Sequence, residues 1–379
     1  MSPPGNTPLP PLPGAGGVVH NTTAQSNPWA GVAAAEAVPG SGQPGQPVAP
    51  RTDPFPGLPA GPTRVDRAPT AVLVIAAVIV LAVIAGAAFV LIRGGRQYPS
   101  AWDARVAPIT EWVSKERELE FRHPVKVNFL SEKEYTARST AGGDDDSVES
   151  KQYYADQLAQ LRALGFVSGD VDLAKANDTL SDSGTLAYYD PAVEQVFVRG
   201  TKLTPALRVT LAHELTHVLQ DQNFDLERLD DLSSGQASVL RALAEGDATK
   251  VEDAYIETLS KADKKAYEDE SKSQGDEATE KIDDEVPPIL TTIFASPYIL
   301  GPRFVDELDA AGGWKAIDEA LQDPPTEEAM FDPITYETDA AKERSVEVQA
   351  PKGAEVIETD EFGPTGWFLL LASRIDPKI

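Results

Sequence analysis

The 379-residue sequence contains no cysteine and only four histidines, His20, His123, His213 and His217. The lack of cysteine excludes disulfides, iron–sulfur clusters, thiol nucleophiles and zinc sites with cysteine ligands. A bound metal ion would therefore have to take its ligands from histidine, aspartate, glutamate and water.

Basic charge is also scarce. The chain has 33 lysines and arginines against 60 aspartates and glutamates, which gives a net charge of −27. The first 70 residues contain three charges of each sign, so the whole acidic excess lies after residue 70. No run rich in lysine or arginine interrupts it, and an acidic surface repels phosphate groups. We therefore expect no nucleic-acid partner.

Large apolar side chains are rare in residues 1–70, which instead hold 16 of the 31 prolines and 10 of the 28 glycines. Stretches such as PPLPGAGG and PGSGQPGQP cannot bury enough apolar surface to offset the entropy lost on ordering. We predict that residues 1–70 form a disordered tail.

Residues 71–92, AVLVIAAVIVLAVIAGAAFVLI, contain no charged side chain. A helix of this length spans about 33 Å, close to the hydrocarbon thickness of a bilayer. The segment begins too late and is too long for the apolar part of a signal peptide. We predict one transmembrane helix. Arginines flank it on both sides, so they do not decide its orientation. The large acidic part that follows favours a single-pass protein of the cell membrane whose C-terminal domain is extracytoplasmic.

Residues 93–379 are expected to form one folded extracytoplasmic domain of mixed, mostly helical structure. PVKVNFL (124–130) is typical of a short strand, and TLAYYD and EQVFVRG on either side of Pro191-Ala192-Val193 predict a β-hairpin. Thr204-Pro205 is a helix start, and a second helix is expected over about 235–260. The charged residues 261–285 indicate an exposed helix or excursion. Shorter helices are expected over 302–313 and 314–323, and WFLLLA (367–372) is interpreted as core.

The stretch LAHELTHVLQ, residues 211–220, contains His-Glu-Leu-Thr-His. On a helix, His213 and His217 lie about 40° apart on one face, while Leu207, Leu211, Leu215, Val218 and Leu219 lie opposite. The histidines are thus on a polar face, where core histidines are not expected. Two imidazoles one turn apart can bind a single Zn²⁺ ion, which lowers the pKa of a bound water to about 7. Glu214 between them is the candidate general base.

The residues alone leave the third ligand open. In one known pattern the third ligand is a histidine six residues after the second. That pattern does not apply here, because Asn223 occupies the position. Glu245, 28 residues after His217 on the next expected helix, can face the same cleft. The rival ligands are Glu227, Asp247, Glu252 and His123, of which His123 is interpreted as structural.

Taken together, HELTHVLQDQNFDL (213–226), LAEGDA (243–248) and GGWKAIDEALQDPP (312–325) resemble the gluzincins, zinc metallopeptidases whose third ligand is glutamate. They look most like bacterial members that are secreted or membrane-anchored. The resemblance implies a zincin-like α+β fold with zinc ligands His213, His217 and Glu245, and Glu214 as base. It also implies that the hairpin borders the cleft, where an edge strand binds extended peptide.

The chain departs from thermolysin-like members after the third ligand, where Thr249 replaces the usual aspartate. A carboxylate that orients a ligating imidazole must therefore come from elsewhere, with Asp221, Asp225 and Asp247 as candidates. Four tyrosines are candidates for stabilising an oxyanion: Tyr188, Tyr189, Tyr255 and Tyr298. The sequence thus predicts a membrane-anchored zinc metallopeptidase acting on peptides or proteins. The alternative is a peptidase-like envelope protein that acts as a binding or scaffolding module.

Overall fold

The computed structural model describes residues 98–140, 147–183, 185–332 and 361–372, with a few isolated positions between and after the last two ranges. The predicted tail (1–70) and membrane span (71–92) lie outside these residues, so the domain division and the membrane topology stay predictions. Within the described ranges, no helix is both long and apolar enough to cross a bilayer.

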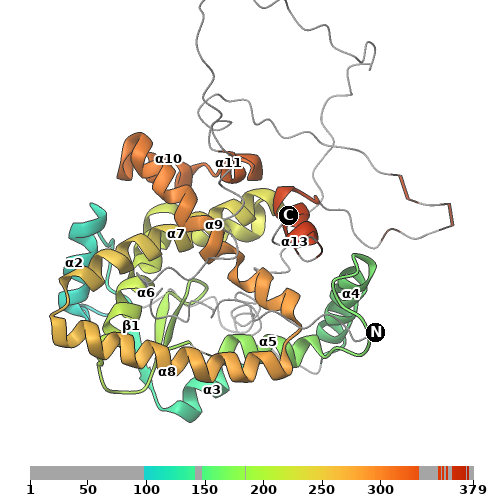
Figure 1. Ribbon diagram of the computed structural model, residues 1–379. Helices are drawn as coiled ribbons and strands as arrows, with labels where there is room; N and C mark the ends of the chain where they lie inside the picture. The colour runs from blue at the N-terminus through green and yellow to red at the C-terminus, as the bar shows by residue number, and fades with distance from the viewer. Residues whose placement is uncertain are drawn as a thin grey trace, which may run out of the picture.

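The described residues form a mostly helical α+β structure with one three-stranded sheet (Figure 1). The strands are β1 (Lys126–Leu130), β2 (Ala187–Asp190) and β3 (Gln195–Arg199). The helices before and after them are α2 (Ala107–Arg117), α3 (Glu132–Ser139), α4 (Val148–Ala163), α5 (Leu173–Asp182), α6 (Pro205–Phe224), η1 (Leu226–Asp231), α7 (Ser234–Thr258), α8 (Lys261–Glu285), α9 (Pro288–Gly312), α10 (Trp314–Gln322), α11 (Glu327–Phe331) and α13 (Pro364–Ala372). The predicted mostly helical α+β class, with a small sheet before the long helices, is confirmed.

The sheet has the order β1-β3-β2 and is mixed. β2 and β3 form the predicted antiparallel hairpin, in which Tyr189 pairs with Val196. β1 joins the other side of β3 in parallel, with Val127 opposite Val196. In this sheet β2 is therefore an edge strand, and it lies against α6. The hairpin prediction is confirmed.

α6 begins where the sequence indicates. The Thr204 side chain accepts a hydrogen bond from the Leu207 N–H, and Pro205 occupies the first turn, where its missing N–H costs nothing. The predicted apolar face is buried, but the face that carries the histidines is buried too: Thr216 and Gln220 have 0 % exposure. This polar face is buried because α7 and α8 also pack on α6.

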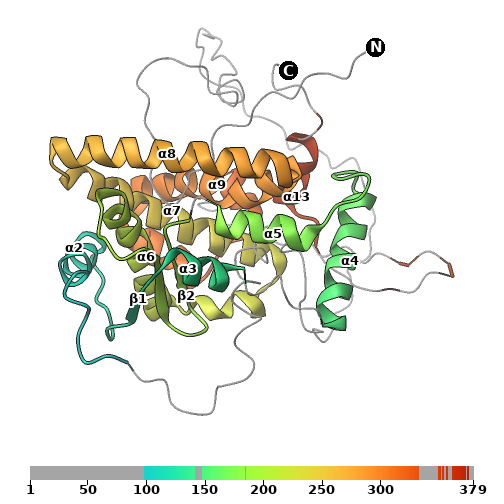
Figure 2. The same cartoon turned by 90° about the horizontal axis from the view of Figure 1, so that it is seen from below.

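Three hydrophobic clusters hold the described helices together. The first joins the sheet to α2 and α6, the second joins α7, α9 and α10, and the third joins α5 to parts of α8 and α9. α8 is confirmed as one long charged helix, and it runs across α6 and α5 along one side of the molecule (Figures 1 and 2). The antiparallel pair α6 and α7 thus lies between the first two clusters, in the interior.

Two C-terminal expectations need correction. The helix expected over 302–313 is the second half of α9, which has 25 residues and continues through Pro297 and Pro302. The stretch 367–372 lies in α13, but only Leu369 is buried there, while Trp367 is 53 % exposed. This segment therefore packs at the edge of the third cluster and is not part of a continuous core.

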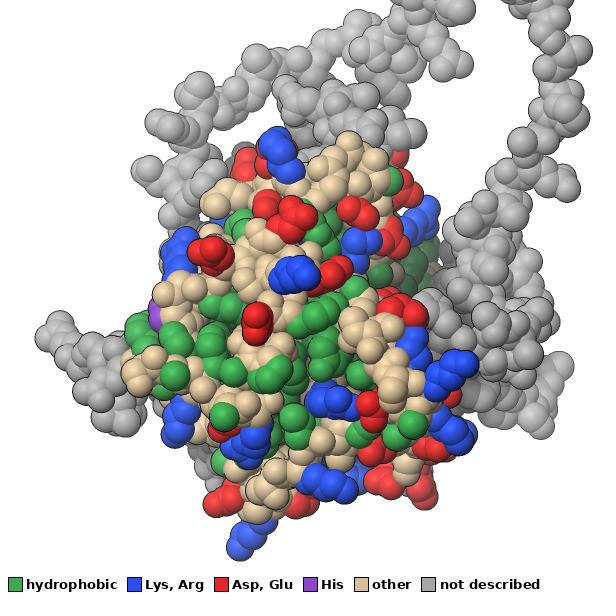
Figure 3. Space-filling view, turned by 90° about the vertical axis from the view of Figure 1, so that its left-hand side faces the viewer, with side chains coloured by type: hydrophobic (Ala, Val, Ile, Leu, Met, Phe, Trp, Pro, Cys, Tyr) green, Lys and Arg blue, Asp and Glu red, His purple; other side chains and the backbone are tan. Residues whose placement is uncertain are grey.

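Figure 3 shows the side of the molecule on which α2 lies. Among the coloured residues, acidic and basic side chains are interspersed around a band of apolar ones, with no broad area of one charge on this face. The excess of acidic residues is therefore not gathered into one patch on this side.

Candidate metal centre

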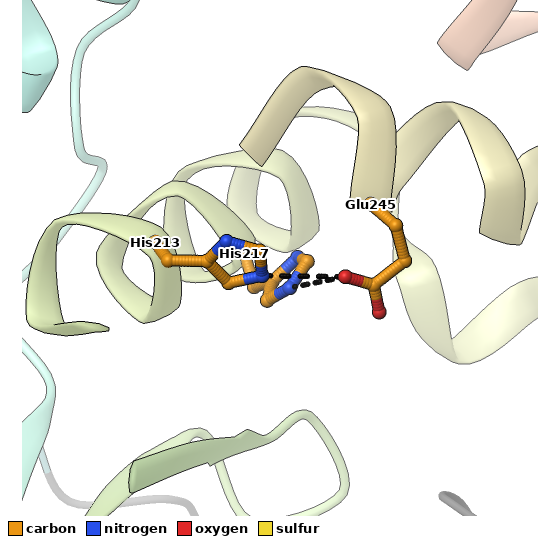
Figure 4. A group of neighbouring side chains, drawn as sticks. All are labelled: His213, His217 and Glu245. Atoms are coloured by element: carbon orange, nitrogen blue, oxygen red, sulfur yellow. Dashed lines mark hydrogen bonds and ion pairs between the residues drawn. The ribbon is translucent and has the colours of Figure 1, made fainter. Parts of the chain in front are cut away.

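Three predicted ligands meet between α6 and α7. His213 and His217 project from one side of α6, and Glu245 faces them from α7 (Figure 4). The Oε2 atom of Glu245 lies 3.2 Å from Nε2 of His213 and 3.5 Å from Nε2 of His217. In the described part of the chain, this is the one group of three such side chains whose ligand atoms converge, all within 4.8 Å of one another.

These distances fit a metal site. Two atoms that each lie 2.0–2.1 Å from a tetrahedral ion are about 3.3 Å apart, and the observed 3.2 Å and 3.5 Å bracket that value. Two imidazole nitrogens and one carboxylate oxygen form a donor set that zinc accepts. The residues present therefore suit a divalent metal ion of the zinc type.

Each imidazole is oriented by a hydrogen bond at its other nitrogen. Nδ1 of His213 lies 2.9 Å from Oε2 of Glu252, and Nδ1 of His217 lies 2.9 Å from Oε1 of Gln220. Both Nε2 atoms are thereby directed at Glu245. Bonds of this kind fix the tautomer and the ring angle of metal-binding histidines. Glu252, a rival for the third ligand, instead supports His213.

The electrostatics of the group favour a bound cation. Burial lowers the pKa of His213, but its hydrogen bonds with Glu245 and Glu252 outweigh burial and raise that pKa well above its usual value. Burial alone would raise the pKa of Glu245, yet the charge of His217 and the bond to His213 bring it well below the usual range. Carboxylates buried around two imidazoles thus require positive charge, which protons or a metal ion supply.

Glu214 lies beside the group without joining it. The residue is 6 % exposed, and its Oε2 accepts the backbone N–H of Tyr189 on β2 at 2.8 Å. Burial raises the pKa of Glu214, and the nearby His217 and His213 oppose that increase. The edge strand therefore holds the predicted base next to the ligands, so the hairpin does border the site.

Of the four candidate tyrosines, Tyr298 on α9 is the one beside the ligands. Its ring stacks on that of His213 with 6.4 Å between centroids, and its hydroxyl bonds to Glu245. Burial, together with the charges of Glu245 and Glu214, raises the pKa of Tyr298 well above its usual value, so the hydroxyl keeps a proton to donate. The other three contact neighbours away from the ligands: Tyr188 stacks on Phe197, the Tyr189 hydroxyl donates to Asp221, and Tyr255 packs on Trp112.

The remaining candidates lie outside the ligand group. His123 stacks on Tyr98 and pairs with Glu194, as a structural residue would. Glu227 is exposed on η1, and Asp225 ends α6 in a left-handed conformation. Asp221 accepts bonds from Tyr189 and Leu226, and burial raises its pKa to about 6. Asp247 reaches His217 only through Gln220.

Sequence reasoning missed the support role of Glu252 and Gln220. Glu252 is seven residues after Glu245, two helical turns along the same face of α7, so its position beside the group could be inferred from spacing. Gln220 is three residues after His217 on α6, also within reach along the helix. The role of each depends on how α6 and α7 pack, which spacing does not give.

Replacing Glu245 with glutamine tests the ligand assignment. An amide oxygen is a neutral and weak ligand. Changing a residue that only hydrogen-bonds to a ligand costs about 10–100-fold in metal affinity, so replacing a ligand itself is expected to lower the affinity by more than about 100-fold. Competition with a chromophoric chelator measures the affinity. Glu227→Gln is the matched control, because this carboxylate is exposed and apart from the group. Equal affinities of Glu245→Gln and the wild type would remove Glu245 from the ligand set.

The fold and the site define a mostly helical α+β protein with a His–His–Glu group suited to a metal ion. Searches against known protein families, curated proteins and solved structures found no match for this chain. Its function is therefore argued from the site.

Proposed function

We propose that the chain is a membrane-anchored, zinc-dependent metallopeptidase that hydrolyses peptide bonds outside the cytoplasm, with Glu214 as general base. The observation that carries this proposal is the convergence of His213, His217 and Glu245 on one point next to a buried glutamate. A pure binding module with a structural metal has no use for a base at this position.

A zinc ion bound by the three ligands would lower the pKa of water and polarise the carbonyl of the scissile bond. Glu214, held by the Tyr189 N–H, would take the proton of the attacking water and deliver it to the leaving amine. Tyr298 has a protonated hydroxyl that bonds to Glu245, and once a metal ion takes up that carboxylate the hydroxyl would be free to donate a hydrogen bond to the developing oxyanion.

A peptide substrate is supported by β2. This edge strand lies against α6 and supplies the backbone N–H that holds Glu214. An extended peptide laid along such an edge would pass close to the base and to the ligands. The membrane anchor rests on residues 71–92 alone, and the extracytoplasmic location on the charge pattern around them.

Removing the metal from the purified full-length chain tests the proposal. We expect about one zinc per chain and cleavage of casein, with cleavage lost after dialysis against a chelator and restored by stoichiometric Zn²⁺. Thermal unfolding with and without zinc reports binding independently, because an ion at 100 times its Kd adds about 2.7 kcal/mol of stability. Zinc binding without turnover on a broad peptide library would favour the binding or scaffolding alternative, and absence of binding would exclude both.

A further inference from the structure

A buried chain of hydrogen bonds leads from His217 away from the metal site. The Oε1 atom of Gln220 lies 2.9 Å from Nδ1 of His217. The Nε2 atom of Gln220 donates to the Ala244 carbonyl at 2.9 Å and to Oδ2 of Asp247 at 2.8 Å. Gln220 and Asp247 have 0 % exposure, so water does not compete for these bonds.

Asp247 is in turn fixed by an arginine that is far away in the sequence. Its Oδ1 accepts a hydrogen bond from Nε of Arg117, the last residue of α2, at 2.7 Å. Arg117 is also fully buried, bonds to Asp318 on α10, and lies over the Trp314 ring at 4.4 Å. Paired with this guanidinium, Asp247 presents only acceptor oxygens.

The two acceptors determine which way the Gln220 amide points. An amide has one donor end and one acceptor end, and the donor end already faces Asp247 and the Ala244 carbonyl. The acceptor end must therefore face His217. An acceptor at that place requires a hydrogen on Nδ1 of His217, which leaves the Nε2 lone pair directed at Glu245.

We propose that Gln220 and Asp247 are positioning residues that select the tautomer of His217 needed for metal binding, with Arg117 locking Asp247 in place. This inference rests on the metal-binding part of the proposed function and is independent of peptide hydrolysis. It explains why the buried ion pair between Arg117 on α2 and Asp247 on α7 is present, although this pair contacts neither the ligand atoms nor Glu214.

The other histidine provides an internal comparison. Nδ1 of His213 bonds directly to Glu252, with no amide between them. A carboxylate accepts from either oxygen, so the tautomer of His213 does not depend on how an amide is turned. A change at Asp247 is therefore expected to affect His217 and leave the tautomer of His213 as it is.

Asp247→Asn is the sharpest variant because it preserves the shape of the side chain. The asparagine oxygen is expected to face Nε of Arg117, the charged donor, which turns its N–H₂ group towards Gln220. Two N–H₂ groups repel each other, and only the Ala244 carbonyl still favours the original orientation, so the Gln220 amide turns over in a fraction of the molecules and presents N–H to His217. In that fraction Nδ1 becomes the acceptor, the hydrogen moves to Nε2, and the lone pair facing Glu245 is lost.

The experiment measures two quantities on the full-length chain. Competition with a chelator should show zinc affinity lowered by about 10–100-fold in Asp247→Asn. Imidazole ¹⁵N shifts, recorded without metal at a pH high enough to keep the rings neutral, should show the hydrogen of His217 shared between Nδ1 and Nε2 in Asp247→Asn, with His213 unchanged. Asp182→Asn is the matched control, because Asp182 pairs with Arg199 away from the site, and it should leave both quantities as in the wild type.

Gln220→Met keeps the proposal testable if Asp247→Asn does not fold. Methionine has similar length and gives His217 neither donor nor strong acceptor, so the two tautomers of His217 should become mixed and zinc affinity should fall by about tenfold or more. A His217 that stays hydrogenated at Nδ1 to the same extent as in the wild type, in either folded variant, would overturn the proposal. A loss of affinity in Asp182→Asn as large as in Asp247→Asn would do the same, because it would indicate general loss of structure.

Discussion

Replacing Glu214 with glutamine is expected to lower kcat for peptide cleavage by about 10²–10⁴-fold while the chain keeps its metal ion. Glutamine has the same shape and can still accept the Tyr189 N–H that holds this side chain at 2.8 Å. What it cannot do is take up a proton. Because no ligand atom changes, metal affinity is expected to stay close to that of the wild type.

Cleavage of casein and of a fluorogenic peptide, with metal content measured on the same preparations, checks this expectation. Glu257→Gln is a suitable control, because Glu257 is exposed at the end of α7 and pairs with Lys264. Wild-type kcat in Glu214→Gln would show that another group takes the proton. Loss of metal together with activity would show that Glu214 belongs to the ligand set.

The elements next to the site were largely predictable because their signals are local. The Thr204-Pro205 start of α6 and the hairpin around Pro191 depend on neighbours in the sequence, and both are present. The convergence of His213 with His217 follows from one helical turn. Glu245 was a harder inference, since it depends on α7 packing antiparallel to α6, and the resemblance to gluzincins carried it.

The support around the ligands could not be predicted, because it joins residues far apart in the sequence. Arg117 and Asp247 are 130 positions apart, and nothing in either segment indicates the other. The same holds for Tyr298, which reaches the site only because α9 crosses α7 closely. The burial of the polar face of α6 could not be predicted either, since a helical wheel counts polar side chains but does not show that another helix covers them.

Two glycines, Gly246 on α7 and Gly301 on α9, allow these two helices to cross closely. A Cβ atom on Gly301 would lie 2.0 Å from the Ala242 carbonyl oxygen, and one on Gly246 would lie 2.4 Å from the Gly301 carbonyl carbon. Both obstacles are backbone atoms, so no side chain can rotate aside. Gly246 follows the candidate ligand Glu245 directly, and Tyr298 is one turn before Gly301. The glycine pair therefore sets how near Tyr298 comes to the metal group.

Gly301→Ala is expected to destabilise the fold by about 3 kcal/mol, at the upper end of the range for overpacked cores. Relief of the clash requires α9 to move away from α7, which carries Tyr298 away from Glu245. His213, His217 and Glu245 lie on α6 and α7, so metal affinity should change much less than kcat. Urea unfolding, chelator competition and peptide cleavage separate these three effects.

Gly275→Ala is the matched control, because Gly275 lies within α8 and a Cβ atom there would meet nothing within 4 Å. Alanine at an unobstructed helical position reduces the entropy of the unfolded chain, so this variant should gain roughly 0.5–1 kcal/mol of stability. Opposite signs for the two Gly→Ala changes would show that the cost at Gly301 comes from contact between helices. If Gly301→Ala kept wild-type stability and kcat, α9 would have room to shift without consequence, and the close crossing would not be what positions Tyr298.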